Sequence, residues 1–369
     1  MRKIRLAIIG QGRSGRNIHA EYLKKDQRYQ IVAVADFLEE RRQRAMADYK
    51  CDAYADYHDL FKRKDIDLIV NSSFSYMHVP ITLEILKAGF NVLCEKPLAS
   101  RVADVDKMIA AAKKARRLFA VYQQSRLASY FQQVQKVIDS GVLGRIVQIS
   151  IAFNGFSRRW DWQTLQAFNG GNLLNTGPHP LDQALQLFGE GMPKVTCFMD
   201  RVNTAGDAED HVKLIMSGAG HPTIDLEISS ACAYPCFTYN VYGSCGGLKG
   251  STSAMEWRYF KPREARKLKV VKTPISTPAG IPAYCDGCSP DNLKWYVDAW
   301  PVSAQPGKKP AGGGYTASHP PADMSASFYT MLYKVLVKKA PLPITPEQVR
   351  RQIAVIEECQ RQNPQIYGK

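Results

Sequence analysis

Three glycines near the start of the chain have a spacing that suits the binding of a diphosphate. Gly10, Gly12 and Gly15 form the pattern G-x-G-x-x-G directly after the apolar run IRLAII. The first glycine can adopt the backbone angles of a tight turn, the second lets the main chain approach a diphosphate, and the third permits close helix packing. Arg13 and Ser14 begin the helix, whose first N–H groups face the phosphates. The pattern therefore predicts a dinucleotide-binding turn between a strand and a helix.

A carboxylate follows at the distance that this kind of turn requires. The second apolar run, at 31–35, ends at Asp36, twenty-one residues after Gly15. A carboxylate there can accept a hydrogen bond from the ribose 2′-hydroxyl and repels a 2′-phosphate, which predicts NAD as the cofactor. NADP is the alternative, because Arg41 and Arg42 follow closely. The alternative for the motif itself is a glycine turn in another βαβ unit, with Asp36 as a solvated loop acid.

Alternating apolar strands and helices must position these residues. After the second strand, helices are expected over 38–49, 80–88 and 102–117, and strands over 53–54, 66–71, 91–94 and 119–122. Short links between alternating strands and helices predict a doubly wound parallel sheet, the Rossmann fold. Ligands bind beyond the carboxyl ends of such strands. Ser73 follows the fourth strand, and Glu95 and Lys96 follow the fifth, so we expect all three to line one crevice with the glycine turn.

The pattern changes in the second part of the chain. Longer runs of alternating apolar and polar residues predict strands over 146–152, 194–199, 211–216, 223–229 and 238–242, with helices over 130–140, 180–188, 325–338 and 346–361. The segment 273–321 is rich in Pro and Gly, which predicts a long loop. The fold class is therefore α/β plus α+β, in which a Rossmann domain over 1–122 precedes an open, mainly antiparallel sheet domain with helices over 123–369.

Composition narrows the class of protein and the kinds of partner. A length of 369 residues suits two domains. The formal net charge is +15, but the basic residues are dispersed and no nucleic-acid-binding motif accompanies them, so a basic surface and no nucleic-acid partner are expected. No apolar run approaches the ~20 residues that cross a bilayer, which leads us to expect a cytoplasmic protein without membrane contact. Cys285 and Cys288 have C-x-x-C spacing without a clear second ligand pair, so no metal is expected.

Several separated motifs resemble those of the Gfo/Idh/MocA family, which includes glucose–fructose oxidoreductase and inositol dehydrogenase. The motifs are GQGRSG with Asp36, SFSYMH over 73–78, AGFNVLCEKPLA over 88–99, VYQQSR over 121–126 and GGNLLNTGPHPLD over 170–182. The resemblance covers nearly the whole chain. It implies NAD(P)-dependent oxidation of a secondary alcohol on a sugar or polyol. It also implies a homodimer or homotetramer formed through the C-terminal sheet.

The resemblance further implies that Lys96, His179 and Asn175 are catalytic. A neutral imidazole can accept the hydroxyl proton near pH 7, and an ammonium can stabilise developing alkoxide character. The family commonly has an Asp four residues before the His, whereas this chain has Asn175, whose amide carries no charge that would raise the pKa of His179. Asp182, one helical turn further on, either supplies that carboxylate or forms a local ion pair.

Further contacts are expected from the same resemblance. The additional cofactor-binding residues are Ser73, His78, Glu95, Lys96 and Gln124, and the substrate-binding residues are Lys96, Arg159, Trp160, Asn175 and His179. The cluster at 158–162 is either a platform for a sugar or a packed loop. Two other functions compete with a dehydrogenase: a redox-neutral lyase or glycosidase that keeps its NAD bound, and a non-catalytic dinucleotide-binding protein.

Overall fold

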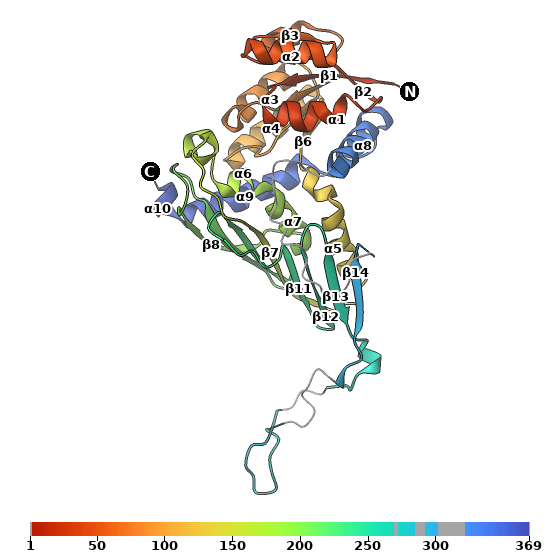
Figure 1. The fold of residues 1–369 in the computed structure, drawn as a ribbon, viewed down its shortest axis with the longest axis vertical. Coiled ribbons are helices and arrows are strands. Elements are labelled where there is room, and N and C mark those ends of the chain that lie inside the picture. Colours follow the sequence, from red (N-terminus) through yellow and green to blue (C-terminus); the bar gives the residue numbers. More distant parts are fainter. Residues whose placement is uncertain (1, 269–271, 285–291, 302–321, 369) are drawn as a thin grey trace.

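The computed structural model describes residues 2–268, 272–284, 292–301 and 322–368, and it contains two sheets of different construction (Figure 1). The first sheet has the order β3-β2-β1-β4-β5-β6, and every pairing in it is parallel. Its strands are β1 (Ile4–Ile9), β2 (Tyr29–Ala35), β3 (Asp52–Tyr54), β4 (Leu68–Asn71), β5 (Val92–Cys94) and β6 (Phe119–Val121). The strand order reverses between β1 and β4, which creates a crevice at their carboxyl ends. The predicted Rossmann fold is confirmed.

Helices cover both faces of this sheet. The helices are η1 (Arg13–Ala20), which is a π-helix, α1 (Glu21–Leu23), α2 (Glu39–Tyr49), α3 (His78–Lys87) and α4 (Val102–Ala115). Shorter 3₁₀ turns are η2 (Tyr57–Lys62), η3 (Ser75–Met77) and η4 (Gln124–Leu127). Successive residues of β1 point to opposite faces: Leu6 and Ile8 pack in one buried cluster, and Ala7 and Ile9 in another. The sheet is therefore buried on both sides, as its nearly continuous apolar strands require.

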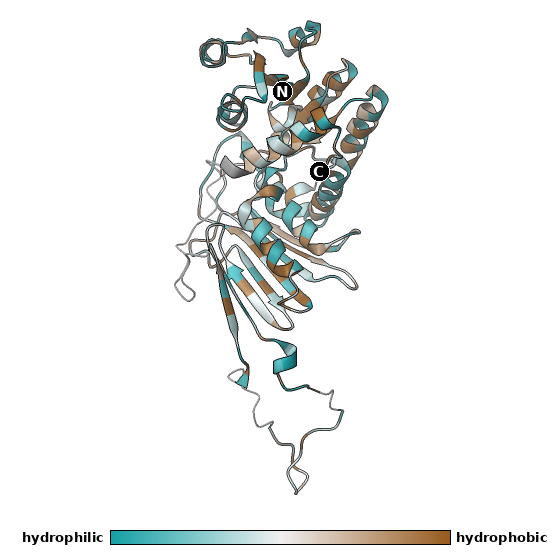
Figure 2. Ribbon diagram, turned by 90° about the vertical axis from the view of Figure 1, so that its right-hand side faces the viewer, coloured by the Kyte–Doolittle hydropathy of each residue, from teal (hydrophilic) through white to brown (hydrophobic). Residues whose placement is uncertain are grey.

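The second sheet has the order β14-β13-β12-β11-β7-β10-β9-β8. Its strands are β7 (Ile146–Asn154), β8 (Lys194–Asp200), β9 (His211–Ser217), β10 (Thr223–Ser229), β11 (Tyr239–Gly243), β12 (Gly246–Gly250), β13 (Met255–Tyr259) and β14 (Tyr296–Trp300). Only β7 and β10 pair in parallel, so the predicted mainly antiparallel domain is confirmed. Buried and more exposed residues alternate along β9 and β10. Figure 2 colours the ribbon by hydropathy, and the strands of the second sheet carry both apolar (brown) and polar (teal) residues.

Three strands of the second sheet differ from the sequence-based expectation. β12 and β13 were not predicted, and β14 lies inside the segment 273–321, where the prediction of a loop is wrong at 296–300. β12 has the sequence GGLKG, whose glycines hide the alternation of a strand. β14 pairs with β13, Met255 opposite Trp300, so its extended form depends on a neighbour that is distant along the chain. The Gly-rich run at 307–314 lies outside the described residues.

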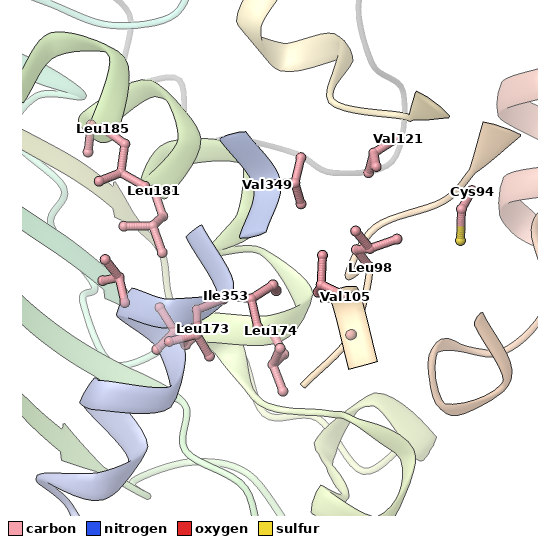
Figure 3. Packing of buried hydrophobic residues seen from close by; sticks show 14 of the residues in the cluster. Cys94, Leu98, Val105, Val121, Leu173, Leu174, Leu181, Leu185, Val349 and Ile353 are labelled. Carbon is pink, nitrogen blue, oxygen red and sulfur yellow. The ribbon is translucent and has the colours of Figure 1, made fainter. Parts of the chain in front are cut away.

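A shared core joins the two sheets. The remaining helical elements are α5 (Ser129–Asp139), η5 (Trp162–Thr164), η6 (Gln166–Phe168), α6 (Asn172–Asn175), α7 (Pro178–Phe188), η7 (Pro262–Glu264), α9 (Pro346–Arg361) and α10 (Pro364–Tyr367). Figure 3 shows Leu173 of α6, Leu181 of α7 and Ile353 of α9 in one cluster with Leu98 and Val105, which belong to the first part of the chain. Packing of this kind holds the α6–α7 segment at a defined place beside the end of β5.

A helix from near the end of the chain also covers the first sheet. α8 (Ala322–Lys338) contributes Phe328, Tyr329 and Leu332 to the cluster that contains Leu6 and Ile8. In Figure 1 this helix lies beside α1. Residues beyond 123 therefore complete the core of the Rossmann sheet. The domain boundary between residues 122 and 123 stays a prediction. Among the described residues, no helix has the length and apolar character that a membrane crossing requires.

Candidate functional site

A cleft of about 820 Å³ opens at the carboxyl ends of β1, β4 and β5. Residues from the glycine turn, these strand ends and the loop at 159–163 form its walls. They include Gly10, Gly12, Arg13, Ser14, Asp36, Phe37, Arg41, Ser72, Ser73, Phe74, Tyr76, His78, Glu95, Lys96, Arg159, Asp161, Trp162 and Gln163. The cleft lies at the switch point of the parallel sheet, where the glycine pattern and Lys96 were expected to meet.

The three glycines of the turn are required for different reasons, which are a left-handed backbone angle, close packing within the protein, and space for a ligand. Gly10 has a φ of +87°, and a Cβ there would lie 2.5 Å from the main-chain oxygen of Ser72. At Gly15 a Cβ would lie 1.8 Å from the oxygen of Gly10, so the helix packs too closely for a side chain. At Gly12 a Cβ would meet only Nη1 of Arg41, at 3.6 Å, so contacts within the protein do not require a glycine there. Gly12 lines the cleft and leaves room for a diphosphate, and this turn therefore fits a dinucleotide.

Asp36 lies at the end of β2 in the wall of the cleft. Its Oδ2 accepts a hydrogen bond of 2.7 Å from the main-chain N–H of Gln11, and its Oδ1 accepts one of 2.9 Å from that of Leu38. Nη1 of Arg41 lies 3.5 Å from Oδ2. A carboxylate has about four acceptor positions, so two backbone donors leave capacity for a ribose hydroxyl. Its role in ribose binding stays a prediction.

Lys96 projects from the end of β5 toward α6. Its Nζ donates a hydrogen bond of 2.9 Å to the main-chain oxygen of Asn175. Burial, aided by the charges of Arg13 and Arg159 and opposed by the carboxylate of Glu95, lowers the pKa of Lys96 to about 8. An amine with this pKa is present in both protonation states near neutral pH, which suits exchange of a proton with a substrate hydroxyl.

His179, expected as the base, is buried in α7 and is not among the described residues that line the cleft. Its Nδ1 lies 3.1 Å from the hydroxyl oxygen of Ser125. Burial lowers the pKa of His179 to about 3, and the charge of Lys96 acts in the same direction. The imidazole is therefore neutral at pH 7 but holds a proton weakly, so Lys96 is the better placed proton acceptor of the two.

Asn175 and Asp182, the two residues considered as partners of His179, have other partners in the structure. Asn175 contacts Lys96 through its main-chain oxygen, an interaction that any residue type at this position supplies. Asp182 forms a buried ion pair with Arg126, with Nε 2.9 Å from Oδ2 and Nη2 2.5 Å from Oδ1. Of the two alternatives for Asp182, the local ion pair is the arrangement that the structure shows.

Four residues expected to contact the cofactor take different positions. Ser73 lines the cleft, and its hydroxyl donates to Oδ1 of Asn71 at 2.7 Å. His78 also lines it, but its two ring nitrogens face the main-chain oxygens of Pro97 and Ser73, at 2.7 and 3.1 Å. Glu95 reaches the cleft from a buried position. Gln124 is buried and is not among the described residues of the cleft wall, although its Oε1 has no hydrogen-bond partner within the described structure.

Within the cluster at 158–162, the tryptophan that lines the cleft is Trp162, whereas Trp160 was the one expected to bind substrate. Trp160 is 82% exposed and does not belong to the described cleft wall. Trp162 does, and its ring centroid lies 5.3 Å from that of Phe74 in an edge-to-face arrangement. Arg159 lines the cleft, but its guanidinium binds the carboxylate of Asp161 at 2.8–3.0 Å and Oε1 of Gln163 at 2.7 Å.

Two further residues that the sequence analysis missed lie behind Lys96. His19 is fully buried in η1; its Nε2 lies 3.0 Å from Oε1 of Glu95 and its Nδ1 lies 2.6 Å from the hydroxyl of Tyr329 on α8. Burial opposes ionisation of Glu95, but the hydrogen bond from His19 and the neighbouring positive charges outweigh it and lower its pKa to about 2. The position of His19 one turn after Gly15 was the available signal, while nothing local indicated Tyr329.

The described residues contain no group of three or more His, Cys, Asp or Glu side chains that could hold a metal ion. Cys285 and Cys288 lie outside the described residues.

Two protein-family models match the chain. One, described as an oxidoreductase family with an NAD-binding Rossmann fold, matches residues 4–123, and the other, the GFO/IDH/MocA C-terminal domain, matches residues 131–249. Together they cover more than half of the chain.

Relatives and solved structures agree with these matches. The chain is 27% identical over 258 residues to the 2,7-anhydro-N-acetylneuraminate hydratase of Mediterraneibacter gnavus, covering 68% of this chain and 67% of that protein. It is 26% identical over 251 residues to the inositol 2-dehydrogenase of Salmonella typhimurium, covering 67% of this chain and 72% of that one. The crystal structure of an NAD-binding protein from Listeria innocua has the same fold, with a TM-score of 0.77 at 19% identity over 98% of this chain and 95% of that one.

Proposed function

Because the chain belongs to the Gfo/Idh/MocA family of oxidoreductases with an NAD-binding Rossmann fold, we propose that it is a dehydrogenase that acts on a sugar or polyol. The reaction is the transfer of hydride between a secondary alcohol and the nicotinamide of NAD(P). The observation that carries this proposal is Lys96, whose ammonium lies in the same cleft as the glycine turn and has a pKa lowered by burial to about 8. The inositol dehydrogenase relative supports the substrate class.

The cofactor would be held by residues of the first sheet. Gly10 and Gly12 let the main chain approach the diphosphate, and the first N–H groups of η1 face it. Asp36 accepts from the ribose hydroxyls, which favours NAD over NADP. When bound, the dinucleotide supplies the acceptor or donor of the hydride.

Lys96 would handle the proton of the substrate hydroxyl. Its ammonium donates to the reacting oxygen and stabilises alkoxide character, and its neutral amine accepts the hydroxyl proton. The hydrogen bond of Nζ to the main-chain oxygen of Asn175 directs the group. His179 is then a neutral imidazole, whose pKa burial and the charge of Lys96 hold low, in place of the base suggested by the family resemblance.

The wall of the cleft supports a neutral substrate. Arg159 is the arginine of this loop that lines the cleft with Trp162, and its guanidinium is already bound to Asp161 and Gln163. A substrate carboxylate would have to displace those partners, whereas the faces of Phe74 and Trp162 suit the C–H groups of a neutral ring. We therefore favour sugars and cyclitols over uronic acids.

Substitution of Lys96 tests the assignment. Lys96→Met should keep NAD binding within a few-fold, because the ammonium is not a diphosphate ligand, and should lose most of the turnover of a neutral substrate identified by thermal-shift screening. His179→Ala serves as the comparison and should retain measurable turnover. Near-normal turnover in Lys96→Met would reject the role of Lys96. Turnover that is lost only in His179→Ala would mean that the imidazole of His179 is the general base.

A redox-neutral reaction with retained NAD is the second candidate. The relative named as a hydratase favours it. A hydratase adds or removes water, so its net reaction neither oxidises nor reduces NAD. Continuous release of NADH in the steady state distinguishes the two, since the second candidate would consume substrate without accumulating NADH.

A further inference from the structure

The carbonyl that binds Lys96 belongs to a helix of a single turn. Nζ of Lys96 donates to the main-chain oxygen of Asn175, the last residue of α6, and the N–H of Asn175 donates to the oxygen of Gly171 at 2.8 Å. A helix this short has little stability of its own, because nucleation is unfavourable. The place of the Asn175 carbonyl therefore depends on contacts that hold the first turn of α6.

Glu209 makes two of these contacts. Its main-chain oxygen accepts from the N–H of Asn172 at 2.9 Å, and its Oε1 accepts from the N–H of Leu173 at 2.8 Å. A Cβ at Gly171 would lie 2.3 Å from Oε2 of Glu209, so this close approach requires a glycine there. The side chain is buried, with 2% of Glu209 exposed. Glu209 thus satisfies the free donors of the first turn, as a helix cap does.

Tyr367 of α10 holds the other side of this carboxyl group. Its hydroxyl donates to Oε2 of Glu209. The neighbouring turn is tied to α10 as well, since Nε2 of Gln166 donates to the main-chain oxygen of Ile366 at 2.9 Å. A continuous series of contacts therefore runs from α10 through Glu209 and α6 to the ammonium of Lys96.

We propose that Glu209 and Tyr367 are positioning residues that hold α6, and with it the Asn175 carbonyl, where it binds Lys96. The proposal rests on the proposed function, in which Lys96 acts on the substrate oxygen. Neither Glu209 nor Tyr367 belongs to the described residues that line the cleft, so both act through α6.

The charge of Glu209 itself does not account for this effect. Burial raises the pKa of Glu209 to about 7, while the donors Tyr367 and Leu173 N–H oppose the rise. The other titratable or charged groups near Glu209 and Tyr367 are Asp210, Asp207, Cys359 and Arg159. The charges that shift the pKa of Lys96 are those of Glu95, Arg13 and Arg159. Loss of the Glu209 charge alone should therefore leave Lys96 unchanged, whereas loss of its hydrogen bonds should not.

The pKa of Lys96 measures whether α6 is in place. A hydrogen bond to the ammonium stabilises the charged form, so displacement of the Asn175 carbonyl should lower this pKa. The pKa is obtained from the pH dependence of amine acetylation at Lys96, followed by mass spectrometry on the full-length protein without substrate. We expect midpoints about one pH unit lower in Glu209→Ala and Tyr367→Phe. Glu209→Gln retains an acceptor for Leu173 N–H and should keep the wild-type midpoint.

Tyr333→Phe is the matched control, because its hydroxyl on α8 donates to the oxygen of Arg2, far from α6. It should leave the Lys96 midpoint unchanged. An unshifted midpoint in folded Tyr367→Phe would overturn the proposal even if Glu209→Ala did not fold, and so would an equal shift in Glu209→Gln. The measurement needs no turnover. Retained activity in Lys96→Met would reject the proposed function and leave the acetylation result standing.

Discussion

Removal of Arg126 should destabilise the protein strongly, because Asp182 would be left as a buried charge without its partner. The two residues are 9% and 1% exposed, and their carboxylate and guanidinium form two parallel hydrogen bonds of 2.9 and 2.5 Å. Breaking a buried pair of this kind on one side costs about 3–5 kcal/mol. Arg126→Met should therefore lower the free energy of unfolding by about that amount, measured by urea denaturation at pH 7.

The double variant distinguishes an unpaired charge from lost packing. Replacing both partners by apolar residues removes the uncompensated charge, so Arg126→Met/Asp182→Leu should be clearly more stable than Arg126→Met alone. Arg350 and Asp106 supply an exposed pair of similar geometry, with contacts of 2.6 and 3.0 Å. Arg350→Met should change stability far less, because water screens an exposed pair.

Two results would refute this reasoning. A loss below about 1 kcal/mol in Arg126→Met would mean that water or another group compensates Asp182. A double variant as unstable as the sum of its single variants would mean that packing, and not charge, dominates.

Three further predictions concern pH, cofactor and substrate. Burial raises the pKa of Glu209 from 4.5 to about 7, so the contribution of its protonated form to stability is present below pH 4.5 and is lost as the pH rises through 7. Glu209→Gln should therefore be more stable than wild type at pH 8, by up to about 3 kcal/mol, and as stable as wild type at pH 4. Thermal unfolding at the two pH values measures this difference. Calorimetry should show that NAD binds more tightly than NADP. Asp36→Ala should reverse this order, because it removes the carboxylate that pairs with Arg41 and leaves that arginine available to a 2′-phosphate. An unchanged order would reject the contact between Asp36 and the ribose. Trp162→Ala should raise the KM of the substrate several-fold, whereas Trp160→Ala should not, and the opposite result would place the substrate outside the cleft.

The acid behind Lys96 illustrates how much of the site is built by contacts across the fold. Glu95 follows β5, His19 lies in η1 and Tyr329 belongs to α8, yet the three side chains form one buried hydrogen-bonded series. A carboxylate only accepts hydrogen bonds, so Nε2 of His19 donates to it, and a hydroxyl can either donate to or accept from Nδ1. Tyr329 therefore satisfies the imidazole in both of its protonation states.

Local patterns in the sequence determined the family, the fold class and NAD as the cofactor, all of which are confirmed. The glycine spacing depends on backbone angles and close packing within one βαβ unit, and the doubly wound parallel sheet follows from alternating strands and helices with short links. Gly10, Gly15 and Asp36 could be placed for this reason. Such features depend on residues near one another along the chain, where periodicity and residue type carry the information.

Tertiary structure alone decided the interactions between distant segments. The partner of Lys96 is a main-chain oxygen, which no residue type reveals, and the choice between Trp160 and Trp162 depends on how the loop at 159–163 packs against Phe74. Pairing with β13 made β14 a strand inside a Pro- and Gly-rich segment. Burial sets the pKa of Lys96 and His179, and burial is a property of the assembled core. The sequence thus specifies which groups are present, whereas their desolvation and their partners arise only when the two sheets pack together.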